Sequence, residues 1–444
     1  MKISVIITAY QSEKFILQCL DSICFQNVDE VLLGIDGCDR VTSIIQKNRF
    51  PKLNAYLFDK TGTYIIRNTL AQIAKGDYLL FIDSDDVACH NMVEVLRNQK
   101  AKITRFKFWD FENELQKNIP EYNQVACGCF FIEKQTFLNN NGFKPFPCSA
   151  DYEFKLRSKN QETAELEERL FYRRKHPNQL TANNQYGMHT EARRKINATI
   201  PEEIKNKPQK LHTTGKYTEV SQKRISFNLA TYPKRKEHLQ KVINSILPQT
   251  DVLRIYLNEC QKIPKEVINP KIEYTVRDAD IKDTGKFYWL NTLRNEYYFT
   301  ADDDILYDPD YAMESIQKMR LTGAAICTVH GRIMNANPVS PSDAKNINHF
   351  FRSQDNDFYC NYCGTGATCV DNSVLSVNLK VFETNGMTDQ YFNVVLQENK
   401  IPILCRAHKP MNSIPYTETL WGDKEKYKKQ NAELLGGIKW KIYQ

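Results

Sequence analysis

The sequence predicts an α/β protein of two tandem domains, each built around a mostly parallel β-sheet. Short β-branched and aromatic runs of strand length alternate with runs of helical spacing, which is the pattern of parallel sheets. The order strand, helix, strand, strand, helix, strand occurs once in residues 3–83 and again from residue 224. Each series closes with an apolar strand that ends abruptly in carboxylates, at residues 83–86 and at residues 302–304. This repeat predicts a duplicated architecture with little sequence identity.

The expected domains are residues 1–185 and 223–444, joined by a polar and basic connector over residues 186–222 that includes a short helix. The composition is 41% hydrophobic and 25% charged, as in ordinary soluble globular proteins. No window approaches the ~18 apolar residues of a transmembrane helix. The β-branched run at residues 1–8 leads straight into a polar turn and lacks a cleavage site of small residues, so we expect a first strand and no signal peptide. These features predict a cytoplasmic protein, free or held at the inner face of the membrane.

Thirteen cysteines, an odd number, are scattered through both halves without a framework spacing. This usage favours free thiols in a reducing compartment. Cys360 and Cys363 form a CxxC pair with Cys369 nearby, which admits a zinc knuckle, although buried reduced thiols are the favoured interpretation. The net charge of +7 is mild. It is compatible with nucleotide sugars, an acidic polymer or a lipid surface as partners, and it selects none of them.

The acids at the strand ends predict metal sites. In α/β sheets, ligands bind beyond the carboxyl ends of the strands. Adjacent carboxylates repel one another, so a fold keeps them where a cation lies close. A hard divalent ion such as Mn²⁺ or Mg²⁺ takes oxygen ligands and can bridge them to the phosphates of a substrate. We therefore expect such an ion at each acid-tipped strand.

One further acid follows each of these motifs. Asp151 and Asp389 both stand at predicted helix starts, after Asn-Gly-Phe and Asn-Gly-Met. A carboxylate placed opposite a metal-bound diphosphate can take the proton of an attacking hydroxyl, which contributes about 10²–10⁴-fold to the rate. The alternative is an acid that merely favours the first turn of a helix through the helix dipole. The parallel placement supports the catalytic interpretation.

The first half carries a set of motifs that extend to about residue 181. They are VIITAY, IDGCD, IIRNTLAQIAKGDYLLFIDSDD, NGF, ADYEFKLR and FYRRKHPNQLT. In these motifs the chain resembles the inverting glycosyltransferases of family 2, which have the Rossmann-like GT-A fold and bind nucleotide sugars. Two departures stand out: Ala150 replaces the usual Glu before the base, and Ile35 replaces the first of two common Asp residues.

The resemblance implies roles for individual residues. Asp36 would hydrogen-bond the nucleotide base, the acids at 83 and 85 would hold a divalent metal on the diphosphate, and Asp151 would be the general base. His176 would be a further metal or phosphate ligand. The implied donor-binding residues of the first half are Thr8, Tyr10, Asp36, Arg67, Asp83 and Ser84, with Asp85 and His176 at the metal.

The second half is similar to bacterial capsule-type transferases through ATYPKR, a helix at DTGKFYWL and the strand YYFTADDDILYDPDY. The resemblance implies that Asp389 is its base and that His408 is a metal or phosphate ligand. The implied donor-binding residues are Thr231, Asn258, Lys286, Asp302 and Asp303, with Asp304 and His408 at the metal. Two GT-A domains in one chain resemble the bifunctional polymerases of glycosaminoglycan-like capsules.

The leading hypothesis is a Mn²⁺- or Mg²⁺-dependent transferase that moves sugars from nucleotide donors, expected to be UDP-sugars, to a growing polysaccharide or other glycan, one sugar per domain. Alternatives are a single-activity transferase with one non-catalytic domain, a non-catalytic carbohydrate-binding protein, and a transferase that modifies nucleic acid through the basic connector. The last would require binding that falls steeply with salt, and the sequence shows no strong nucleic-acid signal. Residues 437–443 predict a terminal strand, with contact to a membrane or export complex as the alternative.

Overall fold

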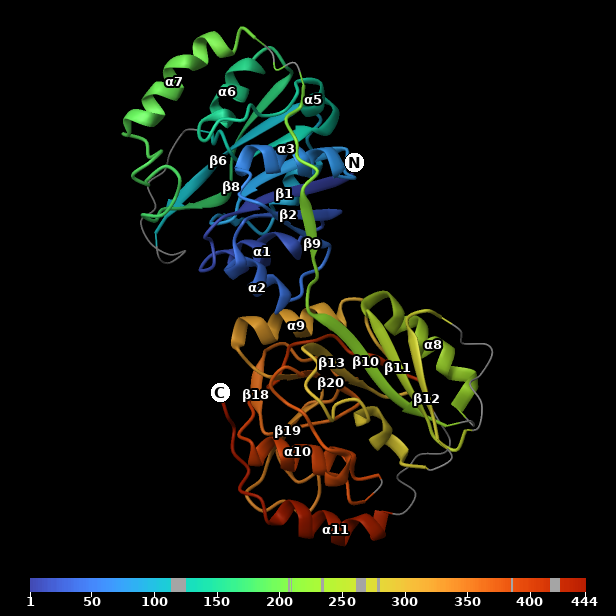
Figure 1. Cartoon of the computed structure of the whole chain (residues 1–444). Coiled ribbons are helices and arrows are strands. Elements are labelled where there is room, and N and C mark those ends of the chain that lie inside the picture. The colour runs from blue at the N-terminus through green and yellow to red at the C-terminus, as the bar shows by residue number, and fades with distance from the viewer. Residues whose placement is uncertain are drawn as a thin grey trace. The chain divides into compact units, whose positions relative to one another are not determined.

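The computed structural model describes residues 1–444 except 113–124, 207, 209, 233–234, 261–268, 278–279, 385 and 416–423. The chain forms two compact units, Met1–Gln222 and Lys223–Gln444. Figure 1 shows the first in blue to green and the second in green to red. No helix within the described ranges is long and apolar enough to cross a membrane. The thirteen cysteines all lie in described parts of the chain, and none forms a disulfide.

The first unit is organised around a nine-stranded sheet with the order β5-β8-β6-β7-β4-β1-β2-β3-β9. Strands β1 to β4 run parallel, whereas β7 pairs antiparallel with β4. Their carboxyl ends therefore meet at one edge, as predicted. The strands are β1 (Ile3–Ala9), β2 (Glu30–Asp36), β3 (Leu53–Phe58), β4 (Tyr78–Asp83), β5 (Val87–Ala88), β6 (Ile103–Phe111), β7 (Phe130–Glu133), β8 (Thr163–Arg174) and β9 (Tyr217–Val220).

Helices cover both faces of this sheet, and the alternation along β1 shows it. Val5 and Ile7 pack in one core with the helix that contains Leu20, while Ile6 packs in a second core with the helix that contains Leu70. Strands buried on both faces are the reason for the nearly continuous apolar runs in the sequence. The helices are α1 (Ile16–Cys24), α2 (Asp39–Gln46), α3 (Thr63–Ile73), α4 (Met92–Arg97), α5 (Lys134–Asn139), α6 (Ala150–Arg157) and α7 (Glu191–Glu203).

Residues 186–222 are part of the first unit, so their interpretation as a connector is wrong. The segment contains the expected helix, α7, and then strand β9, which pairs antiparallel with β3 and covers the edge of the sheet. Asn68 of α3 donates a hydrogen bond to the carbonyl of His212 (3.0 Å), and the Thr214 amide donates to Thr69 Oγ1 (3.0 Å). The sequence looks polar here because an edge strand and a helix on the surface expose most of their side chains.

The second unit has an eight-stranded sheet with the order β12-β11-β10-β13-β20-β15-β21-β18. Its strands are β10 (Arg224–Thr231), β11 (Val252–Leu257), β12 (Ile272–Val276), β13 (Glu296–Ala301), β15 (Ile326–Thr328), β18 (Phe358–Cys360), β20 (Ala367–Asp371) and β21 (Ile403–Cys405). Smaller ribbons are formed by β14 (Ile305–Leu306) with β22 (Asn412–Ser413), and by β16 (Gly331–Met334) with β17 (Ala344–Ile347) and β19 (Tyr362–Cys363).

The two sheets correspond strand for strand, which confirms the predicted duplication. Strands β3-β2-β1-β4-β7-β6-β8 match β12-β11-β10-β13-β20-β15-β21 in order and in relative direction. The register relates the acids as well. In the first sheet, Thr8 of β1 is opposite Asp83 of β4. In the second sheet, Leu229 of β10 is opposite Ala301 of β13, so the following residue of β10 would be opposite Asp302. Asp302 is therefore the counterpart of Asp83.

Two elements of the second unit differ from expectation. The helix predicted around Trp289 and Leu290 is instead a short 3₁₀ helix, η3 (Lys282–Phe287), followed by turns. A Cβ on Gly285 would lie 2.7 Å from the Tyr256 ring, so the backbone lies too close to the sheet for a regular helix with side chains there. The remaining helices are α8 (Lys236–Ile246), α9 (Tyr311–Thr322), α10 (Thr388–Glu398) and α11 (Lys424–Gly436), with the 3₁₀ helices η2 (Leu247–Gln249) and η4 (Leu379–Val381).

The predicted strand at residues 437–443 is also wrong. Those residues follow α11 without pairing to any described strand. The Trp440 indole donates to the carbonyl of Leu435 (3.1 Å), and its ring lies 5.8 Å from that of Tyr362. The segment is held by the Trp440 indole and by two hydrogen bonds between the Lys441 backbone and the Gln397 side chain.

Phe81 of β4 is the test of the core beneath the first acid motif. It is fully buried, and its ring contacts Phe130, Phe137 and Phe143 at centroid distances of 5.1, 5.1 and 5.4 Å. Phe81→Ala should lower the free energy of unfolding of the first unit by about 3–5 kcal/mol in urea denaturation of the full chain. Met188→Ala, at a side chain that is 57% exposed, should change it by less than about 0.5 kcal/mol. Equal effects of the two changes would contradict this packing.

Candidate active sites

A cavity of about 980 Å³ lies beyond the carboxyl ends of β1, β2 and β4 in the first unit. Every residue that the sequence predicted for a site in this half lines it, although the predicted positions span more than half of the unit. What each residue does there stays a prediction. These residues are Thr8, Tyr10, Asp36, Arg67, Asp83, Ser84, Asp85, Asp151 and His176.

One side of the cavity pairs an acid with an imidazole. His176, just after β8, has Nε2 2.9 Å from Asp85 Oδ2, just after β4. The end of β8 also fixes the acid loop, because the Arg174 amide donates to Asp86 Oδ1 (3.0 Å) and its Nε donates to the carbonyl of Asp85 (2.9 Å). Burial, and then the charges of Asp85 and Asp83, hold the pKa of Asp86 well above its usual range. Asp86 is thus an anchor of the loop, and Asp85 is the acid presented with His176.

A buried guanidinium organises the centre of the cavity. Arg67 of α3 is 1% exposed; its Nη2 lies 2.5 Å from Asp83 Oδ1, and its Nη1 donates to the carbonyl of Gly128 (3.1 Å). A Cβ on Gly128 would lie 3.2 Å from Asp151 Oδ2 and 3.7 Å from Asp83 Oδ2. Burial, with repulsion from Asp85 and Asp151, raises the pKa of Asp83, and Arg67 opposes that rise. A glycine thus lets two carboxylates approach one cation.

Asp151 lies in the first turn of α6, as predicted, and its carboxylate is held by Tyr64. The Tyr64 hydroxyl donates to Asp151 Oδ1 at 2.7 Å. Burial and the charge of Asp151 raise the pKa of Tyr64 well above its usual value, so the phenol keeps its proton and acts as a donor. Ala150, at the place of the family's usual Glu, is fully buried in the core of this face. Tyr64 therefore holds the Asp151 carboxylate, beside an Ala150 that has no hydrogen-bonding side chain.

The residue after the second strand has the same structural task in both units. Asp36 accepts from the amides of Thr61 (2.6 Å) and Gly62 (3.1 Å), and so holds the loop that leads into α3. In the second unit, Asn258 accepts from the Ile281 amide (3.0 Å) and donates to the carbonyl of Lys282 (2.9 Å). Asp36 lines the cavity, whereas Asn258 is 2% exposed and fully engaged within the chain.

In the second unit, protein cations neutralise two acids of the triplet. Lys286, which is 2% exposed, has Nζ 2.5 Å from Asp302 Oδ1. Arg235 pairs with Asp303, whose other oxygen accepts from Thr231 Oγ1 (2.7 Å). Thr231 and Asp303 are buried, so they support the acid turn and do not line an open surface. Lys286 stands to Asp302 as Arg67 stands to Asp83.

Asp304 is the acid of the triplet that keeps the most uncompensated charge. Burial, and next the charges of Asp302 and Asp303, raise its pKa to about 7. In the described part of the chain the nearest cation is Arg235, whose Nη1 is 3.9 Å from Asp304 Oδ2. The register makes Asp304 the counterpart of Asp85, the acid that faces His176 in the first unit.

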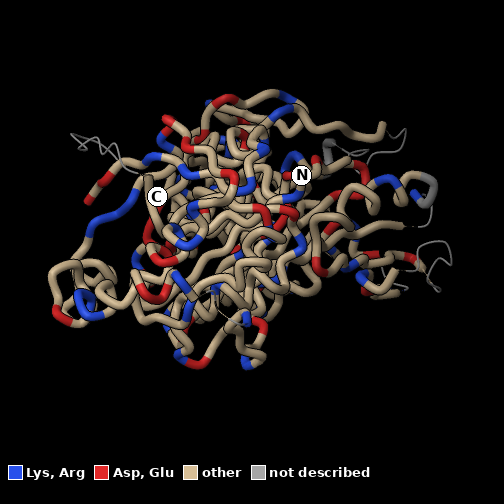
Figure 2. The backbone as a smooth tube through the Cα atoms, turned by 90° about the horizontal axis from the view of Figure 1, so that it is seen from above, with Lys and Arg blue, Asp and Glu red and all other residues tan. Residues whose placement is uncertain are grey.

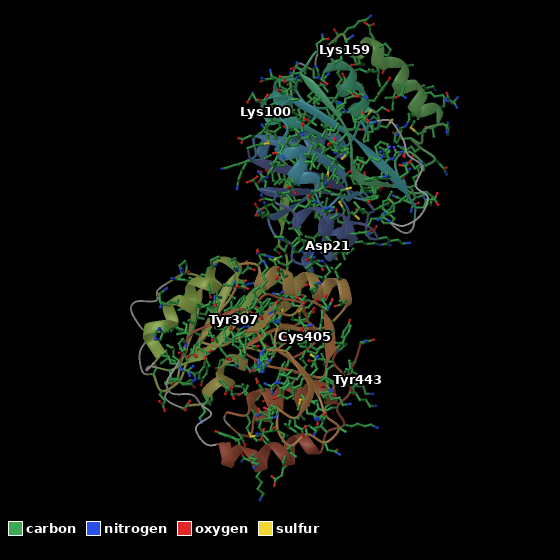
Figure 3. All side chains as sticks on the ribbon, turned by 180° about the vertical axis from the view of Figure 1, so that it is seen from behind. Asp21, Lys100, Lys159, Tyr307, Cys405 and Tyr443 are labelled. Carbon is green, nitrogen blue, oxygen red and sulfur yellow. The ribbon has the colours of Figure 1, made fainter. Side chains whose placement is uncertain are left out.

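A glycine again allows the close approach of the acids. A Cβ on Gly366 would lie only 2.1 Å from Asp302 Oδ2. The register places Gly366 opposite the same point as Gly128, because Phe81 pairs with Phe130 and Thr300 pairs with Thr368. The hydroxyl of Tyr307, labelled in Figure 3, accepts from the Asp302 amide (2.8 Å) and donates to the carbonyl of Gly366 (2.5 Å).

Asp389 lies in the first turn of α10, as predicted, whereas His408 does not join the acids. Asp389 Oδ1 accepts from both the amide (2.8 Å) and the hydroxyl (2.6 Å) of Thr365. The two ring nitrogens of His408 are engaged within the chain, Nδ1 with the carbonyl of Lys409 (2.8 Å) and Nε2 with Asn348 Nδ2 (2.9 Å). The ligand role of His408 stays a prediction, and it would require the imidazole to give up its hydrogen bond with Asn348.

With this geometry described, sequence comparison places the first unit. Residues 4–105 match the model of glycosyl transferase family 2. Residues 4–105 of the first unit are therefore similar to the family 2 glycosyltransferases. Members of this family have the GT-A fold, in agreement with the sheet of β1 to β4 and its acid-tipped edge.

Known relatives match short parts of the chain. A poly(ribitol-phosphate) beta-glucosyltransferase of Bacillus spizizenii is 37% identical over 95 residues, which are 19% of this chain and 15% of that protein. The glycosyltransferase GlyG of Streptococcus pneumoniae is 30% identical over 105 residues, 22% of this chain and 34% of that protein. A glycosyltransferase of Haemophilus influenzae is 32% identical over 158 residues, 32% of this chain and 59% of that protein.

Among solved structures, Staphylococcus aureus TarS 1-349 in complex with UDP-GlcNAc is similar with a TM-score of 0.38 and 19% identity. The similarity covers 47% of this chain and 68% of that one. Each of these matches covers less than half of this chain and only part of the similar protein.

Several residues that shape the two sites carry no sequence signal of their own. In the first unit these are Tyr64 and Gly128; in the second unit they are Arg235, Thr365 and Gly366. The two glycines share one available clue, because Gly366 directly precedes β20 and Gly128 lies two residues before β7, and both strands pair with an acid-tipped strand. The others depend on contacts between segments far apart in the chain.

Gly366→Ala tests whether the acid of the second unit is packed against this glycine. The added Cβ would overlap the Asp302 carboxylate, which Lys286 holds in place, so the free energy of unfolding of the second unit should fall by about 1–3 kcal/mol. Gly437→Ala is the control, because a Cβ there has no neighbour nearer than 3.9 Å. Chemical denaturation of both variants measures the effect, and an unchanged Gly366→Ala protein would show that Asp302 is not seated there.

Proposed function

We propose that the first unit is a metal-dependent glycosyltransferase that moves a sugar from a nucleotide donor to a hydroxyl of a glycan acceptor. The observation that carries the proposal is the joint lining of one cavity by the Asp85–His176 pair, by Asp151, and by Asp36 and Arg67. The family 2 match over residues 4–105 supports the same chemistry.

The acid side fits a Mn²⁺ or Mg²⁺ ion that is shared with the donor. Within the described residues, no cluster of three or more His, Cys, Asp or Glu side chains could hold a metal by itself. Ions of this kind are commonly bound by one or two carboxylates together with substrate phosphates, so Asp85 and His176, with Asp83 beside them, are sufficient. Bound there, the ion supplies Lewis-acid stabilisation of the charge that grows on the leaving diphosphate.

Asp151 is the proposed general base. The acceptor oxygen bonds to the anomeric carbon of the donor sugar as the bond from that carbon to the diphosphate breaks, and the diphosphate leaves with the electron pair. The acceptor proton passes to Asp151, whose Oδ1 is fixed by Tyr64 and whose Oδ2 faces Gly128. A positioned base contributes about 10²–10⁴-fold. A single displacement of this kind inverts the anomeric centre.

The names of the relatives specify an acceptor for those proteins, poly(ribitol phosphate), and no donor. Relatives named as poly(ribitol-phosphate) transferases align with this chain over only 95 residues, and the family 2 match itself ends at residue 105. That matched part contains the strands that carry Asp36 and Asp83. For this chain we propose a nucleotide-sugar donor, with UDP-sugars as the first to test, and a surface polysaccharide as the class of acceptor.

For the second unit we propose a second transferase site, so that each unit adds one sugar. Asp302, Asp304 and Asp389 repeat the layout of Asp83, Asp85 and Asp151, and Lys286 repeats the buried cation of Arg67. The strand register relates the acids of the two motifs, and Asp151 and Asp389 both lie in the first turn of a helix.

A single-activity transferase with a non-catalytic second unit is the alternative with its own observation. Asn258 is buried and hydrogen-bonded within the second unit, whereas Asp36 lines the cavity of the first, and both ring nitrogens of His408 are engaged within the chain. A nucleic-acid substrate has no comparable support. Lys195 and Lys205 pair with Glu191 and Glu202, and Figure 2 shows Lys and Arg interspersed with Asp and Glu along the chain.

Asp85→Asn and Asp304→Asn separate these possibilities. Each change removes a carboxylate charge from one proposed metal site, so Asp85→Asn should abolish one sugar transfer and Asp304→Asn the other, each leaving its partner intact. The assay is incubation with a panel of labelled nucleotide sugars and Mn²⁺, with chelator as the control for metal dependence. If Asp304→Asn changes no transfer, the second unit is non-catalytic; if either change abolishes both half-reactions on matched acceptors, the two-site proposal fails.

Gly128→Ala tests the shared glycine of the first site in the same assay. The Cβ would press on Asp151 Oδ2, and a small displacement of a catalytic group can cost about 10²-fold, so transfer by the first unit should fall about tenfold to a hundredfold. Gly215→Ala should leave it unchanged, because nothing lies within 4 Å of a Cβ there. Equal rates for the two variants would separate Gly128 from the chemistry.

A further inference from the structure

Residues 176–193 connect the metal side of the first cavity to its base side. At one end His176 Nε2 lies 2.9 Å from Asp85 Oδ2. At the other end Arg193 Nη1 donates to Ser149 Oγ (3.3 Å), two residues before Asp151. All residues from 178 to 186 line the cavity between these ends. The segment therefore passes beside the place where the donor diphosphate and the acceptor hydroxyl of the proposed reaction would meet.

The loop within this segment has a defined shape. The Met188 amide donates to the carbonyl of Thr181 (2.8 Å) and closes the loop. Asn183 Oδ1 accepts from the amides of Gln185 (3.1 Å) and Tyr186 (2.6 Å). A Cβ on Gly187 would lie 2.4 Å from the carbonyl oxygen of Asn183, so only glycine fits this turn.

Arg193 ties the loop to the helix that carries Asp151. It is 7% exposed, and besides Ser149 it donates to the carbonyls of Tyr186 (2.5 Å) and Leu180 (3.5 Å). All three guanidinium nitrogens of Arg193 are thus hydrogen-bonded to the loop or to the residue before α6. Because the loop is already ordered, ligand binding does not carry the free-energy cost of ordering it.

The chemistry of the wall is uncharged and amide-rich. Asn178, Asn184 and Gln185 are exposed, and the structure records no hydrogen bond of their side-chain amides to any described residue. Each amide offers two donors and one acceptor with two lone pairs, which suits the hydroxyls of a sugar.

The cations that line the cavity are committed to protein groups. Each arginine of the described lining donates to a carboxylate, a backbone carbonyl, the Gln18 amide oxygen or the Ser149 hydroxyl, so none is left as a dedicated ligand for a phosphate or carboxylate of a polymer. The pairs are Arg67 with Asp83, Arg173 with Asp110, Arg174 with the carbonyl of Asp85, and Arg193 with the carbonyls of Leu180 and Tyr186.

We propose that residues 178–186 form the acceptor subsite of the first unit and bind an uncharged, hydroxyl-rich sugar unit, with Arg193 as a positioning residue that holds this wall against the helix start of Asp151. The proposal rests on the proposed function of the first unit and names the class of its acceptor. It assigns the recognition to a segment beyond the family 2 match, which ends at residue 105.

The test is the double change Asn184→Ala with Gln185→Ala in the full chain, assayed with neutral p-nitrophenyl glycosides as acceptors. Loss of two amides that hydrogen-bond acceptor hydroxyls should raise the acceptor KM about tenfold. The Kd of the donor nucleotide, measured by calorimetry without acceptor, should stay within about twofold. Arg194→Ala is the control. The Arg194 side chain is exposed, and among the described residues its guanidinium donates only to the carbonyl of His189 (2.9 Å).

Arg193→Met should raise the acceptor KM in the same way with little change of donor Kd, and Arg193→Lys should restore part of the loss. The proposal is overturned if the donor Kd weakens instead, if the acceptor KM of the double variant is unchanged, or if no neutral glycoside accepts sugar from a donor that the wild type cleaves. It is also overturned if poly(ribitol phosphate) is the preferred acceptor with a KM that rises steeply with salt. Absence of any cleavage or transfer of a labelled nucleotide sugar by the wild type is a different outcome, because it contradicts the proposed function itself.

Discussion

A buried cation held against the first acid of each motif is the interaction on which both sites depend. Arg67 and Lys286 are almost completely buried, and each lies 2.5 Å from its carboxylate, Asp83 or Asp302. Buried ion pairs of this kind add little net stability, because desolvation offsets the attraction, but removing one partner leaves an uncompensated charge. Their value here is geometric. They allow several carboxylates to share one small volume at the ends of parallel strands.

The two units solve the same electrostatic problem with different residues. In the first, a guanidinium from a regular helix reaches Asp83, and its second nitrogen grips the carbonyl of Gly128. In the second, an ammonium from a 3₁₀ helix reaches Asp302, and Tyr307 bridges Asp302 to Gly366. The glycine is common to both, since a side chain at that point would occupy the space of a carboxylate. The duplication thus kept the positions of the acids more strictly than the identity of their partners.

The strand pattern of the sequence was enough to predict both sheets and their acid-tipped edges, because apolar runs and their polar ends are local signals. The motifs shared with family 2 transferases were enough to predict that Asp85, Asp151 and His176 would belong to one site, and the three residues line one cavity. The rest depended on contacts that no local pattern encodes. Arg235 forms an ion pair with Asp303, and Asn348 lies within hydrogen-bond distance of the His408 imidazole. The partners in each pair are far apart in the sequence. The connector failed for the same reason: β9 is defined by its pairing with β3 and not by its own composition.

The most direct test of the account is the number of divalent ions that the chain binds with a nucleoside diphosphate. Among the described residues, the basic side chains within 4 Å of Asp85 and Asp304 are His176, 2.9 Å from Asp85, and Arg235, 3.9 Å from Asp304. Calorimetric titration of the full chain with Mn²⁺ in saturating UDP should give two ions per chain. A stoichiometry of one, or binding that does not depend on the diphosphate, would contradict the view that the duplicated strand ends form two equivalent metal and donor sites.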